Sequence, residues 1–572
     1  MLNNKKIKVH FLLSMLFLFS FLSTLWMIDL KNSFIFDDYS NLCYARFNSF
    51  EELFKIFPTH TYNDRPIGSI FVKVLNILFG LNYQNYHIIF TFIHYINIFL
   101  VYKISCFLFD FIATEEKKYL SIIAASIFGI YPLSIMSVSW ISAVYDLLCC
   151  LFALLSIMFY LKARISDRYE LNYAALALVC FYLSIRSKEM TLTLPLILFI
   201  YEIWLAIKNK NKIIIKWYLI GKIIIMFLFV FLLFRGGIEE IGPDNPYYQD
   251  FSIPNLFHNA IKYLFLYFDW SNTGFTFYQY TKGAVIGVSF FIVVFLYAIY
   301  SIIKKKEYSI IFLIICIGIS LSVVLTMANM QHRLYLYIPS VFIGITVSAF
   351  IYNILKTRIK YLWEVSIVII IGLYLINFTS GMIGFKSNWM NLCYNDAQGL
   401  KQLERLEKPV EQSNIFVKGT EDTYNIFYYG PGNSMKLLFD DPSLNIFLVD
   451  EFPIEPVKPY IFLEYNNNSI IEVERDMSIP PIEIESVYPE QINEETNFNK
   501  DGTLDIAIVS NIVNEYLKII INGKELNTVI GSDFISTTVP QVLLDDESLN
   551  IQVYDTKAES FSEIITVEID LK

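Results

Sequence analysis

Charge is scarce in this sequence. Only 17% of the 572 residues are Asp, Glu, Lys or Arg, whereas 55% are hydrophobic and the mean hydropathy is +0.48. A soluble domain usually has about a quarter of its residues charged. The composition therefore excludes an ordinary soluble protein and predicts an integral membrane protein whose main partner is the lipid bilayer.

Cysteine is also sparse, and its spacing excludes the usual cysteine-based sites. The seven cysteines are scattered, no pair has metal-ligand spacing, and most lie within apolar runs. We therefore expect them to pack as small hydrophobic residues. Only Cys393 lies beyond residue 390, so the last third of the chain has no internal disulfide.

Positive charge is lacking in that last third. Residues 391–572 contain 33 acids against 12 Lys and Arg, whereas residues 1–390 contain 32 bases and 21 acids. The overall net charge of −10 argues against nucleic-acid binding, which needs a basic face. We predict a basic membrane domain at 1–390 and an acidic, water-soluble region after it.

Long apolar runs dominate the membrane domain. A helix needs roughly 20 apolar residues to cross a hydrocarbon core of about 30 Å. A shorter run, Ile67–Leu81, predicts an interfacial or re-entrant helix, because it carries Lys73 and Asn76. The predicted fold class is a polytopic α-helical membrane protein with about eleven spans. The eleven runs lie near residues 10–30, 86–108, 119–136, 144–162, 171–186, 190–207, 217–234, 284–303, 309–328, 335–355 and 362–385.

Lysine and arginine mark every second loop, as expected for loops that face the cytoplasm. The intervening loops include two long, acidic ones, which should face outward. Eleven spans then give a multi-pass plasma-membrane protein with a cytoplasmic N-terminus and an extracytoplasmic C-terminal region. The first run lacks a small-residue cleavage site, so we expect a retained anchor. The basic segments lie at 5–8, 117–118, 162–168, 208–216, 304–306 and 356–360.

Charged residues gather in four sets at the outer ends of predicted spans, where ionisable groups tend to be paired or functional. Around one vestibule, Arg and Lys could hold a phosphate while a carboxylate takes a proton from a hydroxyl. Each set also has a structural alternative, as a helix cap or a snorkelling anchor. The sets are Asp37, Asp38 and Tyr39; Asp64 and Arg65; Arg186, Lys188 and Glu189; and His332, Arg333 and Tyr335.

The second long outer loop, 235–283, is rich in aromatic residues. Its segment His258–Trp270 predicts an amphipathic helix on the membrane surface. Two interpretations stay open, an interfacial aromatic belt and a lid over a lipid-linked ligand.

Several short motifs follow one another in a fixed order along the spans. In these motifs and in their order, the chain resembles the GT-C superfamily of membrane glycosyltransferases. The resemblance is nearest to protein O-mannosyltransferases and to the transmembrane, tetratricopeptide-containing mannosyltransferases. The resemblance covers about residues 10–355. Its motifs are Phe36-Asp37-Asp38-Tyr39, Arg65-Pro66, Phe79-Gly80-Leu81, Tyr86-His87, His94, Tyr131-Pro132-Leu133, Val138-Ser139-Trp140-Ile141-Ser142, Tyr145-Asp146, Ser187-Lys188-Glu189, Leu194-Pro195 and Arg333-Leu334-Tyr335-Leu336-Tyr337-Ile338-Pro339-Ser340.

The resemblance implies a hexosyltransferase that moves a sugar from a polyprenyl-phosphate carrier to an extracytoplasmic acceptor with inversion. Asp37 would be the catalytic base, with Asp38 as its helper or as a contact to a metal or the acceptor. A divalent cation, Mg or Mn, is compatible with two adjacent acids but not required by them. The phosphate would be held by Arg65, Lys188, Arg333 and Arg186, with Asp64, Glu189, His332, Tyr335, Tyr39 and Asp146 in support.

The sequence lacks the tetratricopeptide repeats of those relatives, so the acceptor is left open between a glycan and a protein. Two other functions also stay open. A transporter or flippase for a lipid-linked glycan should have charges deep in its spans and repeated halves. A non-catalytic anchor for the C-terminal region would need only one span.

The acidic region divides into two predicted domains. Residues 391–478 begin with an amphipathic helix over 391–410 and continue with short strands, which predicts a small α+β unit. Residues 479–572 predict seven strands and a hairpin at Asn522-Gly523, as in an Ig-like β-sandwich. This part resembles an IPT/TIG domain in Val487-Tyr488-Pro489, Gly502 and Ile521-Asn522-Gly523-Lys524. We expect a spacer or interaction module, with carbohydrate binding as the alternative.

Overall fold

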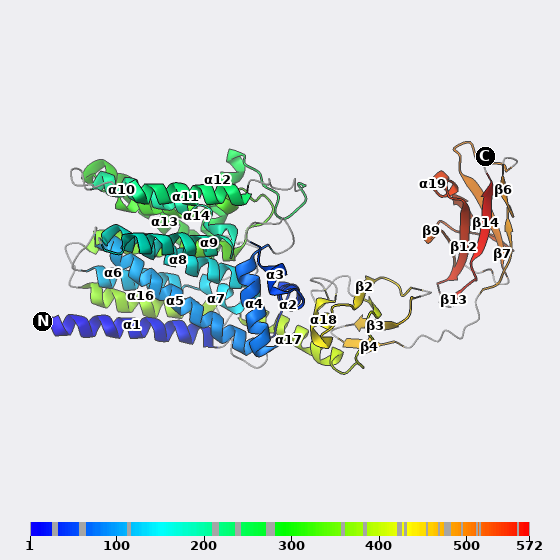
Figure 1. The fold of residues 1–572 in the computed structure, drawn as a ribbon, viewed down its shortest axis with the longest axis horizontal. Helices are drawn as coiled ribbons and strands as arrows, with labels where there is room; N and C mark the ends of the chain where they lie inside the picture. Colours follow the sequence, from blue (N-terminus) through cyan, green and yellow to red (C-terminus); the bar gives the residue numbers. More distant parts are fainter. Residues whose placement is uncertain are drawn as a thin grey trace. The chain divides into compact units, whose positions relative to one another are not determined.

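The computed structural model of the chain forms two compact units, Met1–Arg405 with Thr423–Pro442, and Leu406–Asp422 with Ser443–Lys572 (Figure 1). The predicted boundaries at 390 and 478 stay predictions. The structure describes residues 2–25, 33–55, 64–110, 116–166, 168–208, 217–234, 242–269, 281–355, 361–380, 386–419, 426–427, 432–453, 456–466, 469–473, 482–493, 496–510, 513, 516–556 and 560–570.

Among the described residues of the first unit, seven helices are long and apolar enough to cross a membrane. The other four predicted spans overlap the shorter helices α6 (Lys117–Ile130), α9 (Glu170–Ile185), α11 (Trp217–Phe234) and α14 (Ser309–Leu325). The predicted polytopic helical fold is thus confirmed. The seven are α1 (Leu2–Thr24), α5 (Tyr83–Phe109), η2 (Ile141–Ala143) with α8 (Val144–Ile165), η3 (Glu189–Thr191) with α10 (Leu194–Lys208), α13 (Lys282–Tyr300) with η4 (Ser301–Lys305), η5 (Arg333–Leu336) with α15 (Tyr337–Leu355), and α16 (Leu362–Ser380).

One predicted span ends earlier than expected. We predicted a helix over 119–136, but α6 stops at Ile130, and Tyr131 has an extended backbone with φ of −61° and ψ of 140°. The cause is Pro132, because a proline disfavours helical geometry in the residue before it. A separate short helix, α7 (Leu133–Ser139), follows and leads into η2.

Three short helices pack together at one end of the spans: α2 (Asp37–Phe47), α3 (Phe50–Leu53) and α4 (Pro66–Phe79) (Figure 1). The ammonium of Lys73 on α4 donates to the carbonyls of Ala45, Arg46 and Asn48 at 2.8–3.1 Å. Since the last carbonyls of a helix lack partners within it, Lys73 caps α2 and fixes α4 against it.

An amphipathic helix, α12 (Ile253–Phe268), forms where we predicted one, beginning five residues earlier than expected. Its Asn259 is fully buried and donates to the carbonyls of Leu325 and Met327 at 2.8 and 2.7 Å. The opposite side carries exposed Ile253 and Phe257. The polar contact therefore attaches α12 to the end of α14.

The helix predicted over 391–410 is α17 (Lys386–Leu403), so it starts and ends earlier than expected. A short α18 (Asn433–Phe439) also belongs to the first unit. In the second unit, β2 (Asn445–Val449), β1 (Asn414–Lys418), β3 (Tyr460–Asn466) and β4 (Ser469–Glu472) form one sheet in that order, with β1 parallel to both β2 and β3. The strand expected at 424–429 falls largely outside the described residues.

The rest of the second unit forms two sheets, ordered β10-β11-β7-β5 and β6-β14-β12-β8-β9 with β13 beside β12. One hydrophobic cluster joins them, including Ile506 and Ile535 from the first sheet and Ile519 and Ile551 from the second. All seven predicted strands and the hairpin at Asn522-Gly523 are present. The strands are β5 (Ile484–Tyr488), β6 (Ile492–Asn493), β7 (Leu504–Ser510), β8 (Leu517–Ile521), β9 (Lys524–Leu526), β10 (Val529–Ile530), β11 (Ile535–Val539), β12 (Ser548–Asp555), β13 (Ser560–Phe561) and β14 (Ile565–Asp570), with a short α19 (Gln541–Leu544).

Candidate functional site

The start of α2 places two adjacent acids in different surroundings. Phe36 precedes the helix with φ of 53° and ψ of −128°, a conformation that residues other than glycine rarely adopt. Asp38 is fully buried, and its carboxylate accepts from the N–H and hydroxyl of Ser142 at 2.7 and 2.6 Å and from the N–H of Ile35 at 3.1 Å. Asp38 therefore fastens α2 to η2 and lies out of reach of a substrate.

Asp37, in contrast, lines an open cavity of about 540 Å³, which we call the charged cavity. α1 and α9 end on this side of the first unit, whereas α8 and α15 begin there, so distant loops meet. The wall includes residues of the first loop, the starts of η2 and α8, the turn before η3, and the segment before α15. The lining residues are Asp37, Asn41, Asp64, Arg65, Trp140, Ser142, Tyr145, Asp146, Lys188, Glu189, Tyr247, Met330, His332, Leu334 and Tyr335.

Both cations of the cavity wall are paired with carboxylates. Arg65 makes two parallel bonds to Glu189, from Nε to Oε1 at 3.2 Å and from a terminal nitrogen to Oε2 at 3.0 Å. The Nζ of Lys188 lies 2.7 Å from Oδ2 of Asp146. Such charge-assisted bonds are strong and orient the planar guanidinium. The two pairs join α4, α8 and η3 around the cavity.

Aromatic rings lie beside these cations. The Nζ of Lys188 is 5.1 Å from the ring centre of Tyr335, and the guanidinium of Arg65 is 5.7 Å from that of Tyr145. Tyr145 also donates to the amide oxygen of Asn41 at 3.0 Å. Cation–π contacts of this kind add to the pairing, so each charged head is held on more than one side.

Asp37 is the carboxylate on the wall that has no hydrogen-bond donor among the described residues. Partial burial raises the pKa of Asp37, and the nearby Arg65 guanidinium opposes that rise. A partly desolvated carboxylate with free oxygens is a better proton acceptor than an ordinary surface aspartate. The arrangement can therefore take a proton from a group bound in the cavity.

His332 lines the same cavity as a neutral ring. Its Nδ1 accepts from the N–H of Leu334 at 3.2 Å. Burial, together with the neighbouring Lys188 and Arg333 cations, lowers the pKa of His332 to about 3. His332 is thus a positioning group at the start of η5.

Four of the predicted site residues do not line the cavity. Asp38 is buried as described, and Tyr39 is buried and donates to the carbonyl of Phe34 at 2.9 Å. Arg186 pairs with Asp64 at 3.0 Å and donates to the carbonyl of Lys55 at 2.8 Å. Arg186 is only 3% exposed, so the structure places it behind the wall, where it fixes the first loop.

Arg333 is the clearest departure from the prediction. Its guanidinium pairs with the fully buried side chain of Asp269, at 3.3 Å, instead of facing the cavity. Asp269 follows directly after α12. Arg333 therefore joins η5 to α12, and the cavity wall keeps Lys188 and Arg65 as its cations.

The structure adds wall residues that we did not single out as site residues, among them Asn41 and Tyr247. Asn41 follows Asp37 by one helical turn on α2, a spacing that puts both on one helix face. Tyr247 is presented by the segment 242–250. This segment is held by hydrogen bonds from Asn329 to the carbonyls of Pro243 and Asn245, at 2.6 and 2.9 Å. No local sequence signal marks that tertiary contact.

A resident divalent cation is not supported by the donor atoms. The oxygens of Asp38 are taken up by hydrogen-bond donors, so it does not chelate together with Asp37. Within the described parts of the chain, no group of three or more His, Cys, Asp or Glu residues could hold a metal ion. These side chains therefore do not fit the Mg or Mn that two adjacent acids would permit.

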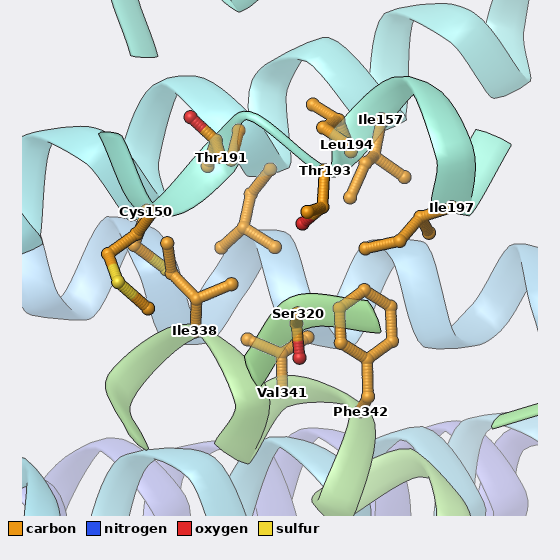
Figure 2. Close-up of a pocket in the computed structure, with 13 residues that line it drawn as sticks. Cys150, Ile157, Thr191, Thr193, Leu194, Ile197, Ser320, Ile338, Val341 and Phe342 are labelled. Carbon is orange, nitrogen blue, oxygen red and sulfur yellow. The ribbon is translucent and has the colours of Figure 1, made fainter. Parts of the chain in front are cut away.

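A second, apolar cavity lies next to η3 and is small, with a volume of about 20 Å³. Figure 2 shows Ile157, Leu194 and Ile197 facing Val341 and Phe342 across it. The wall comes from α8, η3, α10, α14 and α15. Because Glu189 faces the charged cavity while the next two residues face the apolar one, η3 belongs to both walls.

No family model matches the sequence, and no curated protein matches it. Two crystal structures of ArnT from Cupriavidus metallidurans are similar in fold, each at 11% identity. The one bound to undecaprenyl phosphate has a TM-score of 0.42 and covers 80% of this chain and 92% of that chain. The apo structure has a TM-score of 0.43 and covers 77% and 85%. Similarities this weak do not establish the family or the activity of the present chain.

Proposed function

We propose that the chain is a membrane glycosyltransferase of the GT-C type. It would transfer a sugar from a polyprenyl-phosphate carrier to an acceptor hydroxyl, a glycan's or a protein's, on the outer side of the plasma membrane. One observation carries the proposal: the cations Arg65 and Lys188 line one open cavity together with the Asp37 carboxylate, which has no hydrogen-bond donor among the described residues. Deprotonating an acceptor and holding a phosphate need these groups together.

In the proposed reaction, the acceptor hydroxyl gives its proton to the Asp37 carboxylate while its oxygen attacks the anomeric carbon. The bond between that carbon and the phosphate oxygen breaks, and its electron pair leaves with the polyprenyl phosphate. Attack opposite the leaving group inverts the anomeric configuration. Arg65 and Lys188 would stabilise the charge that grows on the phosphate.

The apolar cavity marks where the first isoprene units of the carrier would lie. Its volume of about 20 Å³ means that the surrounding side chains would have to move apart to admit them. Its wall is almost wholly aliphatic and aromatic, with Thr191, Thr193 and Ser320 as its polar side chains. Since η3 separates it from the charged cavity, a phosphate head on one side and a chain on the other would occupy neighbouring spaces. A carrier of this chemistry accounts for a polar and an apolar cavity at one end of the spans.

Asp37→Asn tests the proposed base. Purified protein in lipid nanodiscs would receive labelled polyprenyl-phosphate sugars and an envelope extract as acceptor. The variant should lose transfer by about 10²–10⁴-fold but bind undecaprenyl phosphate, the binding probe, at least as tightly as the wild type does. Glu202→Gln, whose side chain does not line the cavity, should transfer normally. Wild-type protein that fails to bind the probe, or transfer that survives in Asp37→Asn, would overturn the proposal, and lipid movement across vesicles without a transfer product would favour a transporter.

A further inference from the structure

The two cations of the charged cavity are already neutralised inside the protein. Arg65 is bound by both oxygens of Glu189, and Lys188 by one oxygen of Asp146. The wall also carries Asp37 and Asp64, so its carboxylates outnumber its cations. A phosphate entering this cavity must therefore compete with carboxylates for each cation.

The two pairs differ in how easily they can open. The side chains of Lys188 and Asp146 are 9% and 4% exposed, whereas those of Arg65 and Glu189 are 33% and 38% exposed. Glu189 also starts a three-residue turn, η3, whereas Asp146 sits within the long helix α8. An exposed carboxylate on a short turn gives up a partner at a smaller desolvation cost than a buried one on a helix. Glu189 is thus the exchangeable counter-ion.

The phosphate of the product carries more negative charge than that of the donor, and this difference determines how Glu189 affects the release of the product. A polyprenyl-phosphate sugar carries one negative charge on its phosphate, and the polyprenyl phosphate left after transfer carries up to two. The product therefore binds Arg65 more tightly than the donor does. A carboxylate that returns to Arg65 opposes this tighter binding and favours release.

We infer that Glu189 is an internal counter-ion that exchanges with the carrier phosphate on Arg65. It keeps Arg65 oriented in the empty cavity, leaves when the donor phosphate arrives, and returns to help displace the spent carrier. Glu189 acts through Arg65 and is a positioning residue. This inference rests on the proposed function, because it takes the phosphate of a lipid carrier as the ligand.

Glu189→Gln tests the exchange, since glutamine keeps the size of the side chain and removes its charge. Purified variants would be titrated with undecaprenyl phosphate, and with inorganic phosphate in a second arm to separate head-group binding from tail binding. The variant should bind undecaprenyl phosphate about tenfold more tightly than the wild type. In turnover its KM and kcat should both fall, because donor and product are held longer, and the product should inhibit it more strongly.

The matched control is Glu202→Gln, which removes a carboxylate from the pair with Arg164 on α8. That pair has a 2.8 Å contact and 14% exposure on both sides, and it does not line the cavity. Its substitution should leave the affinity for undecaprenyl phosphate unchanged. If Glu189→Gln does not fold, Glu189→Asp should, since it keeps the charge but shortens its reach to Arg65, and it should also bind the probe more tightly than the wild type.

The outcomes separate the two proposals. If the wild type binds no undecaprenyl phosphate, or if Arg65→Met binds it as well as the wild type, the proposed function fails. If the wild type binds the probe through Arg65 but folded Glu189→Gln binds it equally or more weakly, the exchange alone is refuted. In that case Glu189 only orients Arg65.

Discussion

The substitution Asp38→Asn tests whether Asp38 has a structural role, in contrast to the reactive role proposed for Asp37. Asp38 accepts three hydrogen bonds, two from Ser142 and one from Ile35, and it is fully buried. Burial raises the pKa of Asp38 to about 7, so above that pH each bond is made to a charged group and contributes about 1.5–3 kcal/mol. An asparagine retains one acceptor oxygen, and its NH₂ group must face a donor that the carboxylate had satisfied. Weakening two bonds and losing the third should destabilise the first unit by about 2–4 kcal/mol.

The free cysteines of the chain provide the assay. Cys149, Cys150, Cys180, Cys316 and Cys393 are buried, so a thiol-reactive dye reports the unfolding of the first unit on heating in detergent. Asp38→Asn should unfold at a clearly lower temperature than the wild type. Asp37→Asn should unfold at the wild-type temperature or above it, because the Asp37 carboxylate has no donor to lose among the described residues and its partial burial costs free energy. Equal unfolding temperatures for both variants would refute the division of roles between the two acids.

Three further outcomes follow from the same geometry. Burial raises the pKa of Asp37, and Arg65 opposes this rise. In the pH profile of kcat/KM, the acidic limb should therefore lie above the pH at which an ordinary aspartate titrates. Arg65→Met should move that limb higher still, and an unmoved limb would contradict the base assignment. Burial and nearby Asp38 raise the pKa of Asp396 to about 8. The folded chain then keeps a proton that the unfolded chain loses above about pH 4, so stability should fall as the pH rises from there to about 8. Asp396→Asn should flatten this dependence in the dye assay, and a stability that rises with pH would contradict it. Tyr247 is half-exposed on the cavity wall, so Tyr247→Ala should raise KM without changing the unfolding temperature, and Tyr247→Phe should retain most of the affinity if the ring makes the contact. Equal KM values for all three proteins would remove Tyr247 from the binding surface.

The helices of the membrane domain were predictable because hydropathy is a local signal. In lipid, each apolar run must form a helix so that its backbone N–H and C=O groups are hydrogen-bonded within the run. The exception at Tyr131 was also encoded locally, since Pro132 sets the backbone of the residue before it. The count of spans placed Asp37, Arg65 and Lys188 in loops on the same side of the helix bundle. Distances within the vestibule did not follow from that count.

Pairing partners, in contrast, could not be read from the sequence. Arg333 was expected at the phosphate because of its motif, but its partner Asp269 lies 64 residues earlier and reaches it only through the packing of α12. The choice between Asp37 and Asp38 depends on the unusual backbone of Phe36, which rotates one carboxylate inward and leaves the other on the cavity wall. Adjacent identical residues carry no local signal that distinguishes them.

The pairing of the wall charges also bears on why Asp37 is the exception. Burial of a cation or carboxylate without a counter-ion costs free energy, so charged residues in partly buried sites are usually paired inside the protein. Arg65, Lys188 and Arg186 each have one. Among the described wall residues, Asp37 is the carboxylate for which the structure provides neither a paired cation nor a hydrogen-bond donor. The fold pairs the other charges at this site but leaves the half-buried Asp37 carboxylate unpaired. The free-energy cost of burying an unpaired charge therefore falls on Asp37. The cost is accounted for if the missing partner is the proton of a bound substrate.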